Sequence, residues 1–157
     1  MLAGAMSFVS RLAFGAMMTA KALWSPVALG VHALIVDADG KVLLARHSYI
    51  KGWSLPGGGV GRGEPPLTAL RRELREKLGT VTSSEPELIG MFSRRAGWAT
   101  NVVLLYRLNN ASVAFTPNFE VREILFVDPK SPPPGTSAGT RRRLAEFARK
   151  TPPALRW

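Results

Sequence analysis

A glycine-rich stretch followed by closely spaced acidic residues is the part of this sequence best suited to chemistry. Residues 57–63 read GGGVGRG, and Glu73 and Glu76 follow at positions three apart. On a helix, this spacing places both carboxylates on one face, where they can bind the same hard cation. Backbone amides at the junction of a loop and a helix can face an anion. The segment therefore predicts a site where a metal ion and a phosphate group meet.

Residues 58–80 resemble the Nudix box, whose pattern is G-x5-E-x7-R-E-U-x-E-E-x-G-U, where U is aliphatic. The matching residues are Gly58, Glu64, Arg72, Glu73, Leu74, Glu76 and Gly79. Two positions differ, because Lys77 replaces the second glutamate of the E-E pair and Thr80 replaces the last aliphatic residue. The resemblance implies an α/β fold, a Nudix-type α/β/α sandwich with a mixed central sheet. It also implies hydrolysis of the diphosphate linkage in a nucleoside diphosphate joined to another group.

The same resemblance implies roles for individual residues. Glu73 and Glu76 would be catalytic and would bind Mg²⁺ or Mn²⁺, together with the Gly57 carbonyl and a later carboxylate. Glu120 is the preferred later carboxylate and Glu123 the alternative. The candidates for contact with the nucleotide-like substrate are Arg46, Gly58, Lys77 and Arg94. The residues expected to hold the motif in shape are Glu64, Arg72 and Gly79.

Lys77 leaves three interpretations of the site open. A lysine in place of a glutamate removes a negative charge and adds a positive one. Each unit-charge contact at about 4 Å is worth roughly 4 kcal/mol at an effective dielectric of about 20, so metal binding should weaken. The protein could hydrolyse with its remaining ligands, act as a non-catalytic nucleotide-binding or regulatory module, or use Lys77 to contact a phosphate without metal. A plain helix-surface pair between Glu73 and Lys77 is the structural alternative.

The elements that position these residues follow from the apolar patterning. Residues 27–37 and 41–47 predict two strands joined by a tight turn, and we expect them to form a hairpin. A helix is indicated by a leucine stripe, and Gly79 should end it. Glu73, Glu76 and Lys77 are expected on its solvent face. The later predicted elements are strands at 87–93, 101–108, 112–115 and 124–127, and a basic helix at 140–150.

Length and composition limit the remaining possibilities. The 157 residues are 46% hydrophobic and 20% charged, which predicts one globular domain at 26–150 with a loosely held tail at 151–157. The absence of cysteine excludes disulfides and thiolate metal sites, and His32 and His47 are too far apart to suggest zinc. The net charge of +10 suits polyanionic partners, from nucleotides to RNA or an anionic membrane.

Residues 1–25 form an apolar segment outside the motif-bearing domain, and its helical spacing predicts an extra N-terminal helix. Arg11 and Lys21 interrupt the apolar run, so it does not resemble a membrane-spanning helix. It could pack on the domain, be an amphipathic helix that lies at a membrane interface or binds a partner, or be a signal peptide. The expected location is the cytoplasm, with membrane association through this helix as the alternative. A homodimer is a further option, because dimers are frequent among Nudix domains.

Overall fold

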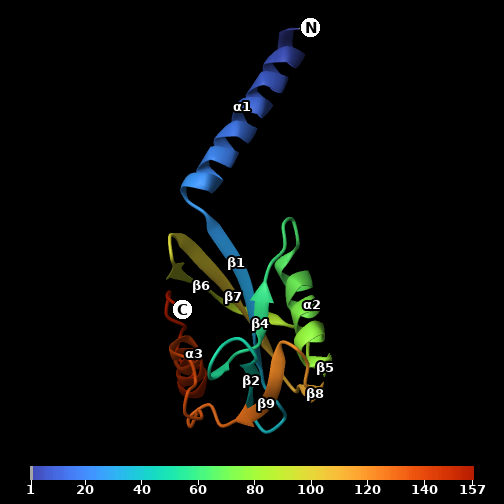
Figure 1. The fold of residues 1–157 in the computed structure, drawn as a ribbon, viewed down its shortest axis with the longest axis vertical. Coiled ribbons are helices and arrows are strands. Elements are labelled where there is room, and N and C mark those ends of the chain that lie inside the picture. Colours follow the sequence, from blue (N-terminus) through green and yellow to red (C-terminus); the bar gives the residue numbers. More distant parts are fainter. Residues whose placement is uncertain (1) are drawn as a thin grey trace.

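The structure is a computed structural model that describes the backbone of residues 2–157 and the side chains of residues 10–157. Helix α1 (Leu2–Trp24) extends away from the rest of the chain (Figure 1). Every side chain from residue 10 to 24 is exposed. The interpretation of this segment as a helix packed on the domain is therefore wrong. Among the described residues, no helix combines the length and the apolar character needed to cross a membrane.

The remaining chain forms two main sheets and a small strand pair. The larger sheet is mixed, because its first strand is parallel to one neighbour and antiparallel to the other. Its strands, in spatial order, are β4 (Gly57–Gly59), β1 (Val27–Ile35), β7 (Ala99–Leu108) and β6 (Glu87–Ala96). The second sheet contains β3 (Trp53–Ser54), β2 (Val42–His47) and β9 (Val121–Val127). The pair consists of β5 (Thr80–Thr82) and β8 (Ser112–Ala114).

Strands β1 and β2 do not form the predicted hairpin. The turn between them does reverse the chain, since the Asp37 N–H donates to the Lys41 carbonyl at 3.0 Å. Beyond a single bridge between Val36 and Val42, however, the two strands diverge. β1 pairs with β7 along its whole length, whereas β2 pairs with β9 in the other sheet. These partners lie far away in the sequence, and local turn chemistry does not reveal them.

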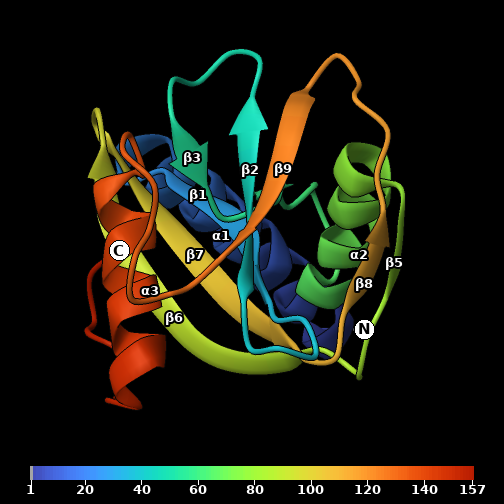
Figure 2. The ribbon, with the colours of Figure 1, turned by 90° about the horizontal axis from the view of Figure 1, so that it is seen from below.

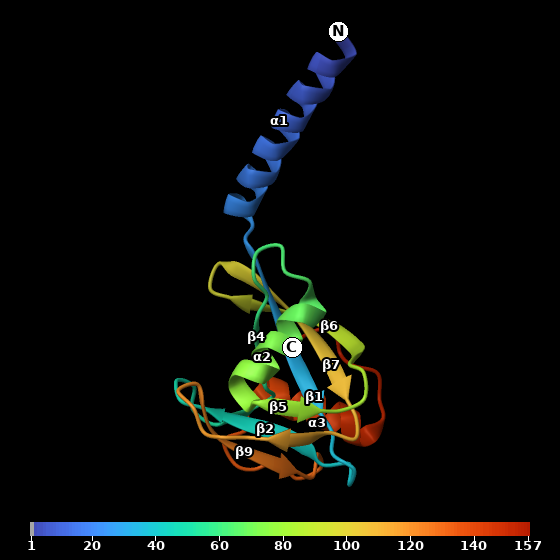
Figure 3. The ribbon, with the colours of Figure 1, turned by 90° about the vertical axis from the view of Figure 1, so that its right-hand side faces the viewer.

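Helices α2 (Pro66–Leu78) and α3 (Ala138–Arg149) lie on opposite sides of the strands (Figure 2). Side chains of β1 are buried on both faces of the strand. Val31 and Ile35 belong to the core beside α2, whereas Leu34 belongs to the core beside α3. Leu144 of α3 is fully buried in that second core. The fold is therefore the predicted α/β sandwich with a mixed sheet and an additional N-terminal helix. Figure 3, turned by 90° about the vertical axis from Figure 1, shows α2 beside β5.

Helix α2 has the predicted apolar stripe and the predicted end, but its acidic face is not where we expected it. Leu70, Leu74 and Leu78 are buried, and Gly79 caps the helix with φ of 77°. Glu73 and Lys77 are only 7% and 5% exposed, so they do not face solvent. They point toward the glycine-rich strand β4, which has no side chains to fill the intervening space. The loop and the helix thus enclose these two charged groups between them.

The C-terminal tail is fixed to the sheet rather than loosely held. Ser93 of β6 donates its N–H to the Leu155 carbonyl at 3.3 Å and accepts one from the Trp157 N–H at 3.3 Å. The Trp157 ring then packs against His32 and Phe92, with centroid separations of 5.0 and 5.6 Å. The tail therefore extends the edge of the larger sheet and places a terminal aromatic ring beside β1.

Candidate active site

The ammonium group of Lys77 lies at the centre of the motif. Its Nζ atom is 2.6 Å from the carbonyl oxygen of Gly57, 3.0 Å from Oε2 of Glu73 and 3.5 Å from Oε2 of Glu120. Burial lowers the pKa of Lys77, but the hydrogen bond and the negative charge of Glu73 outweigh it, so the pKa lies above its ordinary value. The group is therefore a buried cation at neutral pH, surrounded by three oxygens.

Both oxygens of Glu73 already have cationic partners. Oε1 accepts a hydrogen bond from Arg72 at 2.8 Å, and Oε2 faces Lys77. Burial raises the pKa of Glu73, yet the hydrogen bonds from Lys77 and Arg72 bring it below its ordinary value. The side chain is thus an ionised carboxylate held between two cations. Gly58 lies directly against it and leaves the room that it occupies.

Arg72 joins the glycine-rich loop to the helix. It donates two parallel hydrogen bonds of 2.9 Å to Glu64 and a third of 3.0 Å to the Gly59 carbonyl. The hydrogen bonds from Arg72 and from the Gly61 amide lower the pKa of Glu64 to about 2. A bidentate arginine–carboxylate pair fixes geometry as well as charge. This arrangement is what the motif-holding role of Glu64 and Arg72 requires, with Gly79 ending the helix below them.

Three residues predicted for the site lie apart from the Lys77 cluster. Glu76 is half-exposed, and its carboxylate lies 3.5 Å from Arg72. Arg46 pairs with Glu123 and lies over the Trp53 ring, 5.4 Å from its centroid. Glu120, rather than Glu123, is therefore the later carboxylate that the fold brings to the motif. Glu73 and Glu76 do not converge on one point, because the helix turns Glu73 inward and Glu76 outward.

A cleft of about 430 Å³ opens beside Lys77, a size in the usual range for small-molecule sites. Of the predicted substrate contacts, Gly58, Lys77 and Arg94 line it. His32 and Trp157 also line it, although the sequence did not single them out for the site. Nothing in the sequence distinguishes His32 from the apolar residues of its strand. The tail has no periodic pattern that would place Trp157 near the motif. Burial lowers the pKa of His32 to about 4, so its ring is neutral at pH 7.

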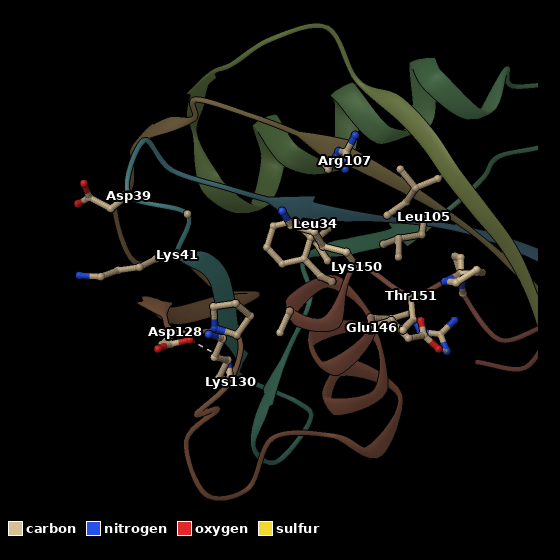
Figure 4. A pocket seen from close by; sticks show the side chains of 18 residues that line it. Leu34, Asp39, Lys41, Leu105, Arg107, Asp128, Lys130, Glu146, Lys150 and Thr151 are labelled. Atoms are coloured by element: carbon tan, nitrogen blue, oxygen red, sulfur yellow. Dashed lines mark hydrogen bonds and ion pairs between the residues drawn. The ribbon is translucent and has the colours of Figure 1, made fainter.

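A larger cavity of about 950 Å³ lies on the α3 side of the sheet (Figure 4). Leu34 and Leu105 form part of its wall, and Arg107, Lys130 and Glu146 stand around it. None of the residues of the glycine-rich motif lines this cavity. This cavity is larger and also has cationic side chains around it, but of the two it is the smaller cleft that Lys77 and the glycines of the motif line. We therefore place the candidate active site beside Lys77.

The oxygens around Lys77 are the ligand type that Mg²⁺ prefers, but as arranged they do not fit a divalent ion. Such an ion, bound to the same oxygens at about 2.1 Å, would lie beside the ammonium. At about 4 Å and an effective dielectric of about 20, the two cations would repel by roughly 8 kcal/mol. Within the described residues, no group of three or more histidine, cysteine or acidic side chains is placed to hold a metal. The cation of this site is Lys77.

Comparisons with known proteins bear on the family of this chain. Residues 26–147 match the family model described as the NUDIX domain. An RNA pyrophosphohydrolase from Xanthomonas campestris pv. campestris is 35% identical over 83 residues, which are 53% of this chain and 36% of the relative. An RNA pyrophosphohydrolase from Xanthomonas oryzae pv. oryzae gives the same values. The chain thus spans about a third of the length of these curated relatives.

Two solved structures share the fold. The MutT NUDIX hydrolase from Burkholderia pseudomallei is 24% identical, with a TM-score of 0.67 over 77% of this chain and 98% of that chain. The MutT protein from Methanosarcina mazei Go1 is 24% identical, with a TM-score of 0.65 over 80% and 96%. Likeness at this identity shows the fold alone. Because the family model covers most of the chain and the whole glycine-rich motif, this chain belongs to the Nudix hydrolase family.

Proposed function

We propose that this chain is a pyrophosphohydrolase that binds a nucleoside diphosphate linked to another group and hydrolyses the diphosphate linkage. One observation carries the proposal: Lys77, Glu73, Glu120 and the Gly57 carbonyl converge beside a cleft at the Nudix box. Family membership and the names of the curated relatives support the reaction class. Binding would place the diphosphate against Lys77, with Arg94 as a second cation on the cleft wall.

The proposed reaction needs a water molecule, a base and a positive charge near the phosphates. Water attacks one phosphorus, the bond from that phosphorus to the bridging oxygen breaks, and two phosphorylated products leave. Glu120 is the best placed proton acceptor, because it is half-exposed and its contact with Lys77 is loose at 3.5 Å. Glu73 is less suited, because both of its oxygens are engaged. Lys77 would stabilise the charge on the phosphate oxygens.

Nudix hydrolases generally use divalent metals, and Mg²⁺ or Mn²⁺ was the expectation from the sequence. The test should therefore vary the cation as well as the substrate. Phosphate release, coupled to a phosphatase, would be measured over a panel of nucleotide diphosphates in EDTA, Mg²⁺ and Mn²⁺. Glu120→Gln should lower kcat at least about 100-fold, the usual scale for loss of a general base. Glu85→Gln, an exposed change outside the cleft, serves as the matched control and should keep wild-type kcat.

A second candidate function is nucleotide binding without turnover. The observation that favours it is the engagement of Glu73, whose two oxygens face Arg72 and Lys77. Such a protein would bind a nucleotide diphosphate and leave it intact. Calorimetric binding of the same panel, followed by chromatography of the ligand, separates the two candidates. Intact ligand after prolonged incubation with saturating protein would support the binding module, whereas two phosphorylated products would exclude it.

A further inference from the structure

We propose that the Lys77 ammonium is a built-in replacement for the divalent cation of the site, so that the protein holds a metal-free diphosphate group. This inference rests on the proposed function, because it names the form of the ligand that the same cleft would take. It predicts a protein that needs no added metal to bind diphosphate. It also predicts that one substitution at position 77 would create a metal requirement.

The position of the ammonium is the first argument. A surface pair between Glu73 and Lys77, four residues apart on a helix, would leave both groups in solvent and contribute little. Here the Lys77 side chain is only 6% exposed, and it crosses from α2 to reach the Gly57 carbonyl on β4. A main-chain oxygen and two carboxylates from three separate segments point at one nitrogen. That convergence is typical of a cation site.

The charges of the cluster are the second argument. Glu73 and Glu120 are both in contact with Lys77, and Glu73 is also paired with Arg72. Burying a carboxylate without a cation is costly, so the enclosed Glu73 needs a positive partner. Lys77 supplies it permanently on the side of β4, because it is covalently attached, and Arg72 pairs with the other carboxylate oxygen. A divalent ion entering the same oxygens would have to displace the ammonium from its buried position.

Access for a phosphate is the third argument. The Lys77 ammonium has short contacts with the Gly57 carbonyl and with Glu73. Its contact with Glu120 is longer, at 3.5 Å, and the Glu120 side chain is 48% exposed. An ammonium has three N–H donors, so the donor directed toward Glu120 can turn to a phosphate oxygen in the cleft. Lys77 lines this cleft together with Arg94. These two cationic side chains suit a diphosphate whose negative charge is not already neutralised by a bound metal ion.

Inorganic pyrophosphate is the simplest probe of this inference. Its binding would be followed by calorimetry in EDTA and in Mn²⁺, and Mn²⁺ binding alone by electron paramagnetic resonance. The variants are Lys77→Glu, Lys77→Met and the control Lys130→Glu, an exposed position outside the cleft with the same change in charge as Lys77→Glu. Circular dichroism would establish that each variant is folded. If Lys77→Glu does not fold, the comparison of wild type with Lys77→Met decides alone.

Wild type should bind pyrophosphate in EDTA, and Lys77→Met should lose at least about tenfold in affinity, as expected for loss of a charge-assisted hydrogen bond. Lys77→Glu should bind Mn²⁺ roughly 100-fold or more tightly than wild type, and should bind pyrophosphate only with Mn²⁺. Lys130→Glu should match wild type in both measurements. The inference is overturned if wild type binds Mn²⁺ as tightly as Lys77→Glu does, or if wild type fails to bind pyrophosphate in EDTA. It is also overturned if Lys77→Met binds pyrophosphate as tightly as wild type does.

These results separate the inference from the proposed function. If pyrophosphate binds as expected but no nucleotide in the panel is cleaved, the hydrolase is wrong and the built-in cation stands. If nucleotides are cleaved only with Mn²⁺ and wild type binds that ion tightly, the hydrolase stands and the built-in cation is wrong.

Discussion

A Cβ atom added at Gly58 would lie 2.0 Å from Oε2 of Glu73, far inside van der Waals contact. Gly58→Ala should therefore push the Glu73 carboxylate away from Lys77. We expect pyrophosphate affinity to fall at least about tenfold, and stability to fall by about 1–3 kcal/mol as the strain and the lost contacts are accommodated. Calorimetry and urea unfolding would measure the two effects.

The matched control for this substitution is Gly59→Ala. A Cβ atom at Gly59 meets nothing within 4 Å, although the residue is the next one in the same strand. This variant should keep wild-type affinity and stability. Equal effects of the two substitutions would mean that the glycines matter for backbone freedom and not for the space that Glu73 occupies.

Arg72→Lys tests whether the bidentate contact to Glu64 holds the glycine-rich loop. Lysine has one ammonium and cannot reproduce the two parallel hydrogen bonds together with the one to the Gly59 carbonyl. We expect the Gly61 amide, which donates to Glu64 at 2.8 Å, to exchange with solvent about tenfold faster. Hydrogen exchange followed by NMR is the measurement. Arg71→Lys, at an exposed neighbouring position, should leave the exchange of Gly61 unchanged, and unchanged exchange in Arg72→Lys would contradict this role.

His32 should make the folded protein less stable in mild acid. Burial lowers its pKa to about 4 from an ordinary 6.5, although the hydrogen bond between Nδ1 and the Leu55 carbonyl at 3.1 Å opposes this. Between about pH 6.5 and pH 4, His32 is protonated in the unfolded chain but neutral in the folded chain. Stability is therefore fully present above about pH 6.5 and is lost as the pH falls toward 4, by up to about 3 kcal/mol.

Urea unfolding of wild type and His32→Gln at several pH values checks this assignment. The variant cannot take up the proton, so its stability should change less between pH 7 and pH 4.5. Any cost of the substitution itself appears at pH 7, where both side chains are neutral, and can be subtracted. An identical pH dependence in the two proteins would assign the acid sensitivity to other groups.

Trp157 should contribute to stability although it lies in the tail that follows α3. Its ring packs on His32 and Phe92, and truncation to alanine removes a large apolar contact. We expect Trp157→Ala to lower the free energy of unfolding by about 2 kcal/mol, below the full cost for a buried tryptophan because the ring is partly exposed. Trp98→Ala is the matched control, since Trp98 is 77% exposed. Equal unfolding midpoints for the two variants would show that the tail does not stay packed on the sheet in solution.

Local pattern was sufficient for those parts of the protein that depend on neighbours in the sequence. The leucine stripe predicted α2, because residues three and four apart share a helix face, and Gly79 marked its end. The motif spacing also indicated that Glu64 and Arg72 would pair, because they lie on one loop and the helix that follows it, and Arg72 contacts the adjacent Glu73 as well. The family follows from the same short segment.

Contacts between distant segments were decided only by the tertiary structure. The two strands expected to form a hairpin separate because β7 and β9 offer longer partners. The tail is held because β6 has a free edge for Leu155 and Trp157. The side chains of residues 10–24 of the N-terminal helix are exposed, although its composition would equally suit a packed helix. In each case the outcome depends on which distant surface is available.

The role of Lys77 divides in the same way. The sequence by itself determined that a cation replaces a carboxylate in the motif, and therefore that the charge of the site is altered. It left open whether the lysine pairs on the surface, weakens metal binding or replaces the metal. The structure directs Lys77 inward to Gly57 and Glu120, residues 20 and 43 positions away, and Gly58 on β4 leaves the space that the neighbouring Glu73 carboxylate occupies. Residue spacing carries no information about such a space.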